Sequence, residues 1–283
     1  MKRKSFVLLA VFVGVGIGLA AGPGWAQEAP GPVKTVASWQ WVLAADLAAG
    51  IEANAGPAQW KQVLILEKSF SAVKDNTLFE DPNGGLSDGA GPKIFAGHTR
   101  QRRGAIGAIR RGLIYFDLSN SGIPGNAPIT KVTLQLHVSD SATGPQTIAL
   151  HRVLKDWGEG ISFSNGTGGI ATPGDATWLH TFYDTSFWTT PGGDFSPVVS
   201  ASAVVAGEET FPLWSARQMI VDVYDWLNSP SENFGWLLQG NESTLGTAKG
   251  FHSREEGTPE FQPLLTIEYQ PVLQSYFIPA VFK

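Results

Sequence analysis

Aromatic side chains are concentrated in one polar stretch of the chain, residues 177–195. Its rings are Trp178, Phe182, Tyr183, Phe187 and Trp188. They stand among Thr, Asp and Gly residues, without the every-other-residue alternation of a strand. Indole and phenol rings offer a rigid apolar face to the C–H groups of a sugar and a polar edge to its hydroxyls. We therefore take Trp188, Tyr183 and Trp178 as candidate carbohydrate-binding residues. The alternative is a satellite core that caps the open end of the fold.

A second stretch, residues 80–89, gathers oxygen donors between glycines that allow the chain to bend. The donors are Glu80, Asp81, Asn83, Ser87 and Asp88. Calcium prefers oxygen ligands of this kind, so Glu80, Asp81, Asn83 and Asp88 are candidate ligands of a structural Ca²⁺ ion, although their spacing is not that of an EF-hand. Turn formation by Asp, Asn, Pro and Gly explains the same cluster without an ion.

Asp156 and Glu159 are the carboxylate pair best suited to glycoside hydrolysis. Catalytic carboxylates normally converge from different strands, whereas these two lie in one short loop. They fit better as side chains that fix the loop by accepting backbone N–H bonds. The chain contains no GxSxG, HExxH or Walker string, and no histidine stands out as part of a Ser/His/Asp triad; His137 falls on the solvent face of an alternating strand. The sequence predicts a protein that is not an enzyme.

Arginines gather in two places. The first group is Arg100, Arg102, Arg103, Arg110 and Arg111. Its Gly-containing surroundings favour a solvated hairpin loop over an anion-binding patch, and both interpretations stay open. In the second place, Arg254 and Glu255 directly precede the last expected strand, where we expect an internal Arg–carboxylate bond that holds the sheet edge.

Composition restricts the class of protein. The 283 residues are 43% hydrophobic and 16% charged, with 33 glycines and 18 prolines, which suits a folded globular chain rather than a disordered one. The chain has no cysteine, which excludes disulfides, thiolate nucleophiles, zinc–thiolate sites and iron–sulfur clusters. Stability must therefore come from packing.

The N-terminus, residues 1–26, has the pattern of a secretory signal peptide. Basic residues in Met1–Lys4 precede an uncharged apolar run, and small residues at Gly24 and Ala26 suit a signal peptidase. An uncleaved anchor is the alternative, and no later stretch is long enough to span a bilayer. Three of the 20 basic residues but none of the 25 acidic ones lie in this segment, so the rest of the chain carries a net charge of −8. We expect a secreted bacterial protein, extracellular or at the cell surface, with no transmembrane span in the mature chain and no nucleic-acid partner.

From residue 62 onward the sequence predicts an all-β fold. In Thr130–Ser139, apolar residues alternate with polar ones, which is typical of a strand with one buried face. The other expected strands are Val63–Phe70, Gly112–Leu118, Thr147–Leu154, Phe234–Gln239 and Leu264–Tyr269. Two packed antiparallel sheets bury such one-sided strands best, so residues 62–270 are expected to form one large β-sandwich.

Three further segments surround or interrupt this sandwich. Residues 27–61 form an N-terminal extension, in which apolar residues spaced by four from Trp39 to Ile51 predict one short helix; a loose extension is the alternative. Met219–Leu227 fits a strand that runs into one short helix ending at Asn228-Ser229-Pro230, with Ser215 or Asp222 as its cap. Residues 271–283 form a short hydrophobic tail that packs as an edge strand or mediates attachment.

Nine strings occur in the order found in the DNRLRE domain family, which this chain resembles over about residues 62–270. They are residues 75–80 (DNTLFE), 89–91, 95–97, 111–118, 156–160 (DWGEG), 176–178, 222–227, 233–236 and 253–255 (SRE), together with the alternating strand at Val132. The resemblance implies a jelly-roll sandwich like those grouped with carbohydrate-binding module family 96, in an extracellular binding or surface module. The departures are Thr77 and Phe79 in place of the two arginines of the family name, the Arg-rich insertion before Leu113, and the long loop between Thr177 and Phe211.

Three functions follow as expectations. The first is a secreted, non-catalytic module that binds polysaccharide or cell-surface glycan through loop aromatics. The second is a structural or adhesive cell-surface protein, which the hydrophobic tail favours. The third is a polysaccharide-degrading enzyme, whose site would have to lie in the sandwich loops.

Overall fold

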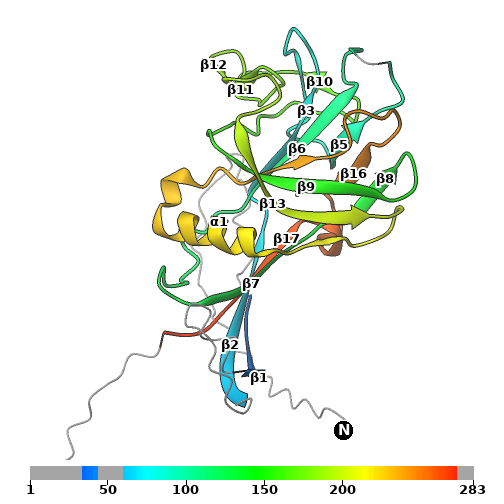
Figure 1. The fold of residues 1–283 in the computed structure, drawn as a ribbon. Coiled ribbons are helices and arrows are strands. Elements are labelled where there is room, and N and C mark those ends of the chain that lie inside the picture. The colour runs from blue at the N-terminus through cyan, green and yellow to red at the C-terminus, as the bar shows by residue number, and fades with distance from the viewer. Residues whose placement is uncertain (1–33, 44–59, 103, 273–283) are drawn as a thin grey trace, which may run out of the picture.

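Two antiparallel sheets packed face to face form the body of the chain, as the alternating patterns predict (Figure 1). The computed structural model describes residues 34–43, 60–102 and 104–272. The expected signal peptide and residues 273–283 of the expected tail lie outside these ranges. All ladders between the described strands are antiparallel.

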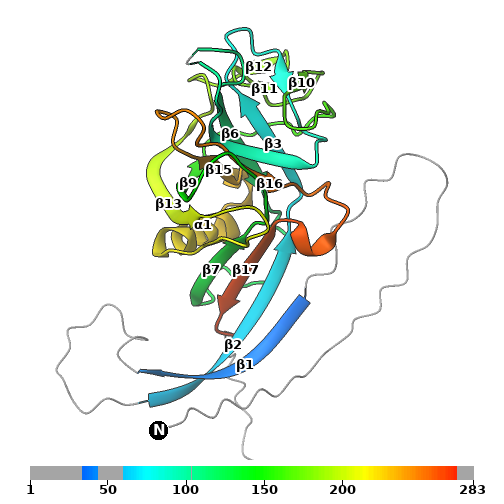
Figure 2. The same cartoon turned by 90° about the vertical axis from the view of Figure 1, so that its right-hand side faces the viewer.

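The first sheet has five strands. Their order across the sheet is β1 (Lys34–Leu43), β2 (Trp60–Ser71), β17 (Leu264–Tyr269), β7 (Ile129–Gln135) and β14 (Leu213–Trp214). The β1–β2 pair extends away from the rest of the sandwich (Figure 2).

The second sheet has eight strands. Their order is β13 (Phe195–Val205), β9 (Gln146–Val153), β15 (Trp236–Gln239), β6 (Ile109–Tyr115), β5 (Lys93–His98), β16 (Lys249–His252) and β8 (Val138–Ser141), with β3 (Lys74–Phe79) also paired to β6. Two short pairs lie outside the sheets, β4 (Leu86–Ser87) with β10 (Gly169–Ile170) and β11 (His180–Phe182) with β12 (Ser186–Phe187).

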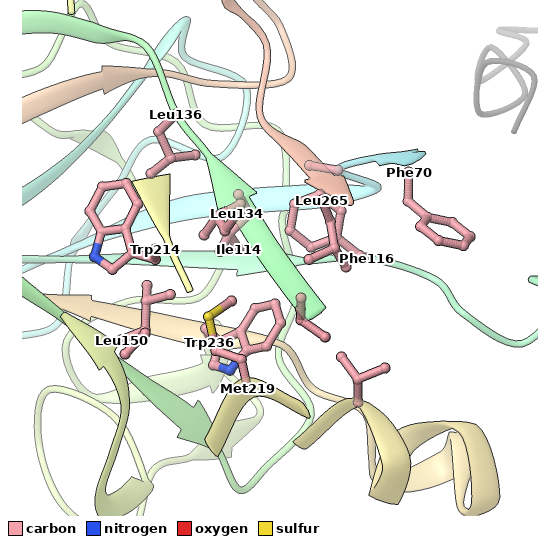
Figure 3. Close-up of a cluster of buried hydrophobic side chains, with 14 of the residues drawn as sticks. Phe70, Ile114, Phe116, Leu134, Leu136, Leu150, Trp214, Met219, Trp236 and Leu265 are labelled. Carbon is pink, nitrogen blue, oxygen red and sulfur yellow. The ribbon is translucent and has the colours of Figure 1, made fainter. Parts of the chain in front are cut away.

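The space between the two sheets is filled by one large apolar cluster, which we call the sandwich core. Leu134 and Leu265 from the five-stranded sheet lie opposite Ile114 and Trp236 from the eight-stranded sheet (Figure 3). Helix α1 (Arg217–Asn228) packs against β7 and β13 and adds Met219, Val223 and Trp226 to the same cluster. Burial of these apolar surfaces is the main source of stability.

The outer face of the eight-stranded sheet is covered as well, by the loops of residues 154–194, which we call the outer layer. On β6, Ile114 belongs to the sandwich core while its neighbour Leu113 packs under the outer layer. On β15, Trp236 faces the core and Leu237 faces outward in the same way. Figure 1 shows the outer layer with β11 and β12 at the top, the eight-stranded sheet in the middle, and the five-stranded sheet with α1 below. A sheet buried on both faces explains why these strands read as continuous apolar runs.

Two expectations about helices are wrong. Residues 34–43 form strand β1, paired along its length with β2 from Lys34–Ser69 to Leu43–Trp60, instead of the start of a helix. The long strand β2 needs a partner for its free backbone groups, and that requirement overrides the spacing of four. Residues 44–59 lie outside the described ranges.

The expected strand at the start of Met219–Leu227 is helical instead. Met219, Asp222, Val223 and Trp226 are buried at spacings of three and four, which turns one face of α1 to the core. The expected end at Asn228 is confirmed. The residue at the N-cap is Ala216, whose side chain makes no capping bond. The expected cap Ser215 does not serve, because its hydroxyl donates to the carbonyl of Val132 instead.

The alternating run Thr130–Ser139 is two strands, not one. It pairs in the five-stranded sheet as β7 and, after Leu136 and His137, in the eight-stranded sheet as β8. His137 therefore stands at a corner between the sheets and is 1% exposed, so its expected place on the solvent face is wrong. Its ring stacks on Phe261, with centroids 3.9 Å apart. Strand β13 likewise occupies part of the expected long loop before Phe211.

Candidate functional site

Trp188 lies inside the outer layer and not on its surface. Its side chain is 5% exposed and packs with Trp157, Leu113 and Leu237. The indole Nε1–H donates to the carbonyl of Thr177 over 2.9 Å. The expectation that this ring is free to stack on a sugar is therefore corrected, because adjacent residues of β12 and its continuation point to opposite sides and Trp188 takes the inward position.

Trp178 is half-buried, and the Arg111 guanidinium lies 4.9 Å from its ring centroid. Arg111 binds Glu242 through two hydrogen bonds of 2.7 and 2.9 Å and also donates to the carbonyl of Gly192. This paired, fork-like geometry fixes the guanidinium in place. Trp178 thus supports the loop at residue 192, with part of its ring still in contact with solvent.

Tyr183 and Phe187 form the exposed part of the aromatic segment. Tyr183 is half-buried with its ring edge toward His180, and Phe187 is 59% exposed with its ring centroid 4.4 Å from that of the same histidine. Phe187 was absent from the candidates chosen by sequence. The alternation of Ser186, Phe187 and Trp188 is the signal that identifies it, since only one of two adjacent rings can face inward.

A cleft of about 440 Å³ lies close to this segment. Its lining residues are Leu154, Lys155, Thr189, Thr190, Gly193, Asp194 and Phe195. The Lys155 ammonium lies 3.0 Å from the Asp194 carboxylate and donates to the Thr189 hydroxyl over 2.7 Å. It also donates to the backbone carbonyl of Phe187, which links the end of strand β12 to the cleft wall.

The wall of this cleft is fixed by Asp194. Its carboxylate accepts the backbone N–H groups of Thr189 and Thr190 over 2.8 and 3.0 Å. Burial alone would raise the pKa of Asp194, but these hydrogen bonds and the one from Lys155 outweigh burial and lower that pKa. Asp194 is therefore ionised at neutral pH, and the cleft presents hydroxyls and a charge pair held in a set geometry.

A second, smaller cleft of about 280 Å³ contains two residues of the first arginine group. Arg100 and Arg110 line it together with Phe95, Asp140 and Glu208. Both arginines are engaged: Arg100 donates to the carbonyl of Ala142 and Arg110 to that of Gly166. The Arg110 guanidinium also lies between the rings of Phe79 and Phe95, at 5.1 and 4.9 Å. Arg110 and Arg111 are thus internal parts of the fold, and only part of the group lies in a solvated loop.

The oxygen donors of residues 80–89 bind backbone groups rather than converging on one point. Asp81 accepts the N–H groups of Asn83 and Gly85, and Glu80 accepts that of Ile109. Asp88, fully buried, accepts the N–H and hydroxyl of Ser164. Within the described residues, these carboxylates form no group of three that lies close enough to share an ion. The turn interpretation fits Asp81, whereas Glu80 and Asp88 hold segments that are distant in sequence.

Three other carboxylates do come together. Oxygens of Asp75, Glu159 and Glu255 lie within 4.8 Å of one another. Arg254 donates to both oxygens of Glu159, over 2.6 and 2.8 Å, which is the internal Arg–carboxylate bond expected from the sequence. Glu159 also accepts the backbone N–H of Asp75 over 2.9 Å and so fixes the loop to strand β3.

Burial and mutual repulsion disfavour the ionised forms of Asp75 and Glu255 in this carboxylate cluster. Burial, followed by repulsion from Glu255, raises the pKa of Asp75 well above its usual range. Burial also raises the pKa of Glu255 to about 7, with repulsion from Glu159 adding to it and Arg254 opposing it. Sequence reasoning missed Asp75 as a site residue. The available signal was that residues 75–80, 156–160 and 253–255, three of the strings on which the predicted resemblance rests, each contribute one carboxylate to the cluster.

Asp156 does not join this cluster. It accepts a hydrogen bond from Lys74 over 2.9 Å and another from the N–H of Trp157. Both carboxylates of the pair considered for hydrolysis therefore fix loops, as expected. Asp156 is paired with Lys74, whereas Glu159 is paired with Arg254.

No protein-family model matches the chain, and no curated protein matches it either. The resemblance to the DNRLRE family therefore stays a prediction. Within the part of the chain that the structure describes, no helix has the length and apolar character needed to cross a membrane.

Proposed function

We propose that the protein is a secreted, non-catalytic module that binds polysaccharide or cell-surface glycan at the cleft between Leu154 and Phe195. The observation that carries this proposal is the cleft itself. Its volume of about 440 Å³ falls within the range of about 300–1,000 Å³ typical of small-ligand sites.

The chemistry of the cleft suits a sugar. Leu154, 52% exposed, and the ring of Phe195 supply apolar surface for C–H groups. The hydroxyls of Thr189 and Thr190, together with the Lys155–Asp194 pair, supply donors and acceptors for sugar hydroxyls. Because Asp194 already holds the wall in place, little conformational entropy is lost on binding.

Phe187 is the side chain whose removal tests the proposal. It is exposed, and its backbone carbonyl accepts a hydrogen bond from Lys155 of the cleft wall, so Phe187→Ala removes an exposed ring from the segment that leads into the cleft without disturbing the core. Phe163→Ala is the matched control, because that ring is 67% exposed but lies in a different loop. Purified protein is passed over insoluble and immobilised glycans, and the retained fraction is measured. We expect at least a tenfold weaker affinity for Phe187→Ala and unchanged retention for Phe163→Ala.

Equal retention by the wild-type protein and Phe187→Ala contradicts the proposed location, and lack of retention on every glycan contradicts the function. The same glycans are assayed for release of reducing ends. We expect none, because Asp156 and Glu159 are held by Lys74 and Arg254.

A structural or adhesive role is the second candidate, and exposed apolar side chains favour it. Ile161, Phe163 and Ile170 are 77, 67 and 86% exposed. They belong to neighbouring segments, since Gly169 packs against the backbone of Phe163. Apolar groups gathered on a surface often mark a protein contact. If Phe163→Ala abolishes adhesion between cells that display the protein while Phe187→Ala leaves it intact, this second function is favoured.

A further inference from the structure

The carboxylate cluster of Asp75, Glu159 and Glu255 encloses an unbalanced charge. Three carboxylates meet one guanidinium, that of Arg254, in a setting where Asp75 is fully buried and Glu159 and Glu255 are mostly buried. With all groups ionised, the net charge of the cluster is −2. Such a charge is costly to keep in a low-dielectric surrounding unless a cation or protons compensate it.

The hydrogen bonds of the cluster leave two oxygens without a partner. Both oxygens of Glu159 bind Arg254, and Asp75 Oδ2 accepts the backbone N–H of Arg254 over 2.8 Å. Glu255 Oε1 lies 3.0 Å from Arg254 Nε. Within the described residues, Asp75 Oδ1 and Glu255 Oε2 are buried and have no hydrogen-bond partner. An unpaired buried carboxylate oxygen is rare in native proteins and needs an explanation.

We propose that Asp75, Glu159 and Glu255 form a binding site for a hard divalent cation such as Ca²⁺. A charge of +2 neutralises the cluster. The ligands are all carboxylate oxygens, which suit the hard cations and not zinc or copper, whose sites in proteins draw on histidine and cysteine. The site is distinct from residues 80–89, whose carboxylates form no group of three close enough to share an ion within the described residues.

The position of the site gives the ion a structural role. Asp75 is the second residue of strand β3, Glu159 belongs to the outer layer, and Glu255 follows strand β16. An ion there joins three segments that are distant in sequence and attaches the outer layer to the sandwich. None of the three carboxylates lines either cleft described above, so the ion would stabilise the fold that carries the glycan cleft without contacting a sugar.

Calcium titration of the purified protein tests the proposal. The protein is first dialysed against a chelator, and Ca²⁺ is then added during calorimetry and thermal melting. We expect one site for each chain and a rise in the melting midpoint with Ca²⁺. Glu255→Gln is expected to weaken Ca²⁺ affinity at least tenfold, and Asp75→Asn by more, because Asp75 is the fully buried ligand.

Two control variants separate this site from other acidic residues. Glu260→Gln changes an exposed carboxylate close in sequence to the cluster, and Asp81→Asn changes the segment 80–89. Both are expected to bind Ca²⁺ like the wild-type protein. If Asp75→Asn does not fold, Glu255→Gln still decides the question, since Glu255 is partly exposed. The far-UV circular dichroism spectrum of the Glu255→Gln protein verifies its fold. The proposal is overturned by the absence of heat and of a midpoint shift at millimolar Ca²⁺, or by Glu255→Gln binding as tightly as wild type. Loss of binding in Asp81→Asn alone overturns it as well.

Discussion

The sandwich core and the outer layer both bury apolar side chains, but their backbone groups are hydrogen-bonded in different ways. In the sandwich core, backbone groups pair in ladders and every second side chain fills the space between two sheets, as in β7 and β17. In the outer layer, Trp157 and Trp188 are also buried, but the surrounding backbone is held by irregular loop bonds, such as the N–H of Trp188 to the carbonyl of Leu179, together with bonds to buried carboxylates. Asp175, for example, accepts the N–H groups of Ser162 and Thr172. The comparison teaches that a second apolar core can be built mostly from loops when irregular backbone bonds and buried acids take the place of long ladders.

The largest difference between the two regions should appear when one tryptophan is removed from each. Trp236→Ala is expected to lower the free energy of unfolding by about 3–5 kcal/mol, because Trp236 packs in the sandwich core and its indole N–H also satisfies Asp222. Trp188→Ala is expected to reduce the urea midpoint less and to speed amide exchange mainly in residues 157–193, since loops with few ladder bonds open locally.

Urea denaturation and native-state hydrogen exchange measure this pair of variants, with Phe187→Ala as the surface control at less than about 0.5 kcal/mol. Equal midpoint losses for Trp236→Ala and Trp188→Ala, with uniform exchange, would show that the two regions unfold as one unit.

The buried acids that hold the outer layer provide the next largest effect. Asp88→Ala is expected to cost about 1–3 kcal/mol, because it leaves the N–H and hydroxyl of Ser164 and the N–H of Gly166 without their acceptor. Asp184→Ala, which changes an exposed acid in the same layer, should leave stability nearly unchanged. Chemical denaturation compares the two variants, and a similar loss in both would mean that buried carboxylates do not hold this layer.

A smaller effect, in both regions, comes from buried histidines. Burial lowers the pKa of His137, at the corner of the sandwich, and of His180, in the outer layer. The unfolded chain then binds more protons, so the stability due to each neutral ring is complete above about pH 6.5 and is lost as the pH falls toward the lower pKa of the folded state.

His137 is faced by His252, Glu209 and Glu256, and His180 by Asp184. A plot of the melting midpoint against pH between 7.5 and 5 should therefore be flatter for His137→Phe and for His180→Phe than for the wild-type protein. Subtracting the wild-type curve removes the opposite slope from Asp75, Asp88 and Glu255, whose pKa values are raised by burial. Curves parallel to wild type would show that the rings are not held neutral.

Sequence reasoning predicted the sandwich well where periodicity carries information. Val63–Phe70 and Leu264–Tyr269 lie in strands with nearly the expected bounds, and the tryptophans 157, 226 and 236 are buried as expected. The change of sheet at His137 was not predictable, because alternation of side chains continues through a corner while the partner strands change. In the outer layer, burial of Trp188 depends on contacts with Leu113 and Leu237, which no local pattern encodes. The carboxylate cluster was missed for the same reason, since its members are distant in sequence.

Hydrogen exchange of the protein with and without a glycan that it retains tests the central claim most directly, namely that a rigid sandwich carries its binding surface in the outer layer. We predict added protection confined to the amides of residues 154–155 and 187–195, with strands β6 and β15 unchanged. Protection centred on Phe95 and Asp140 instead, or no change anywhere in the outer layer, would contradict the account.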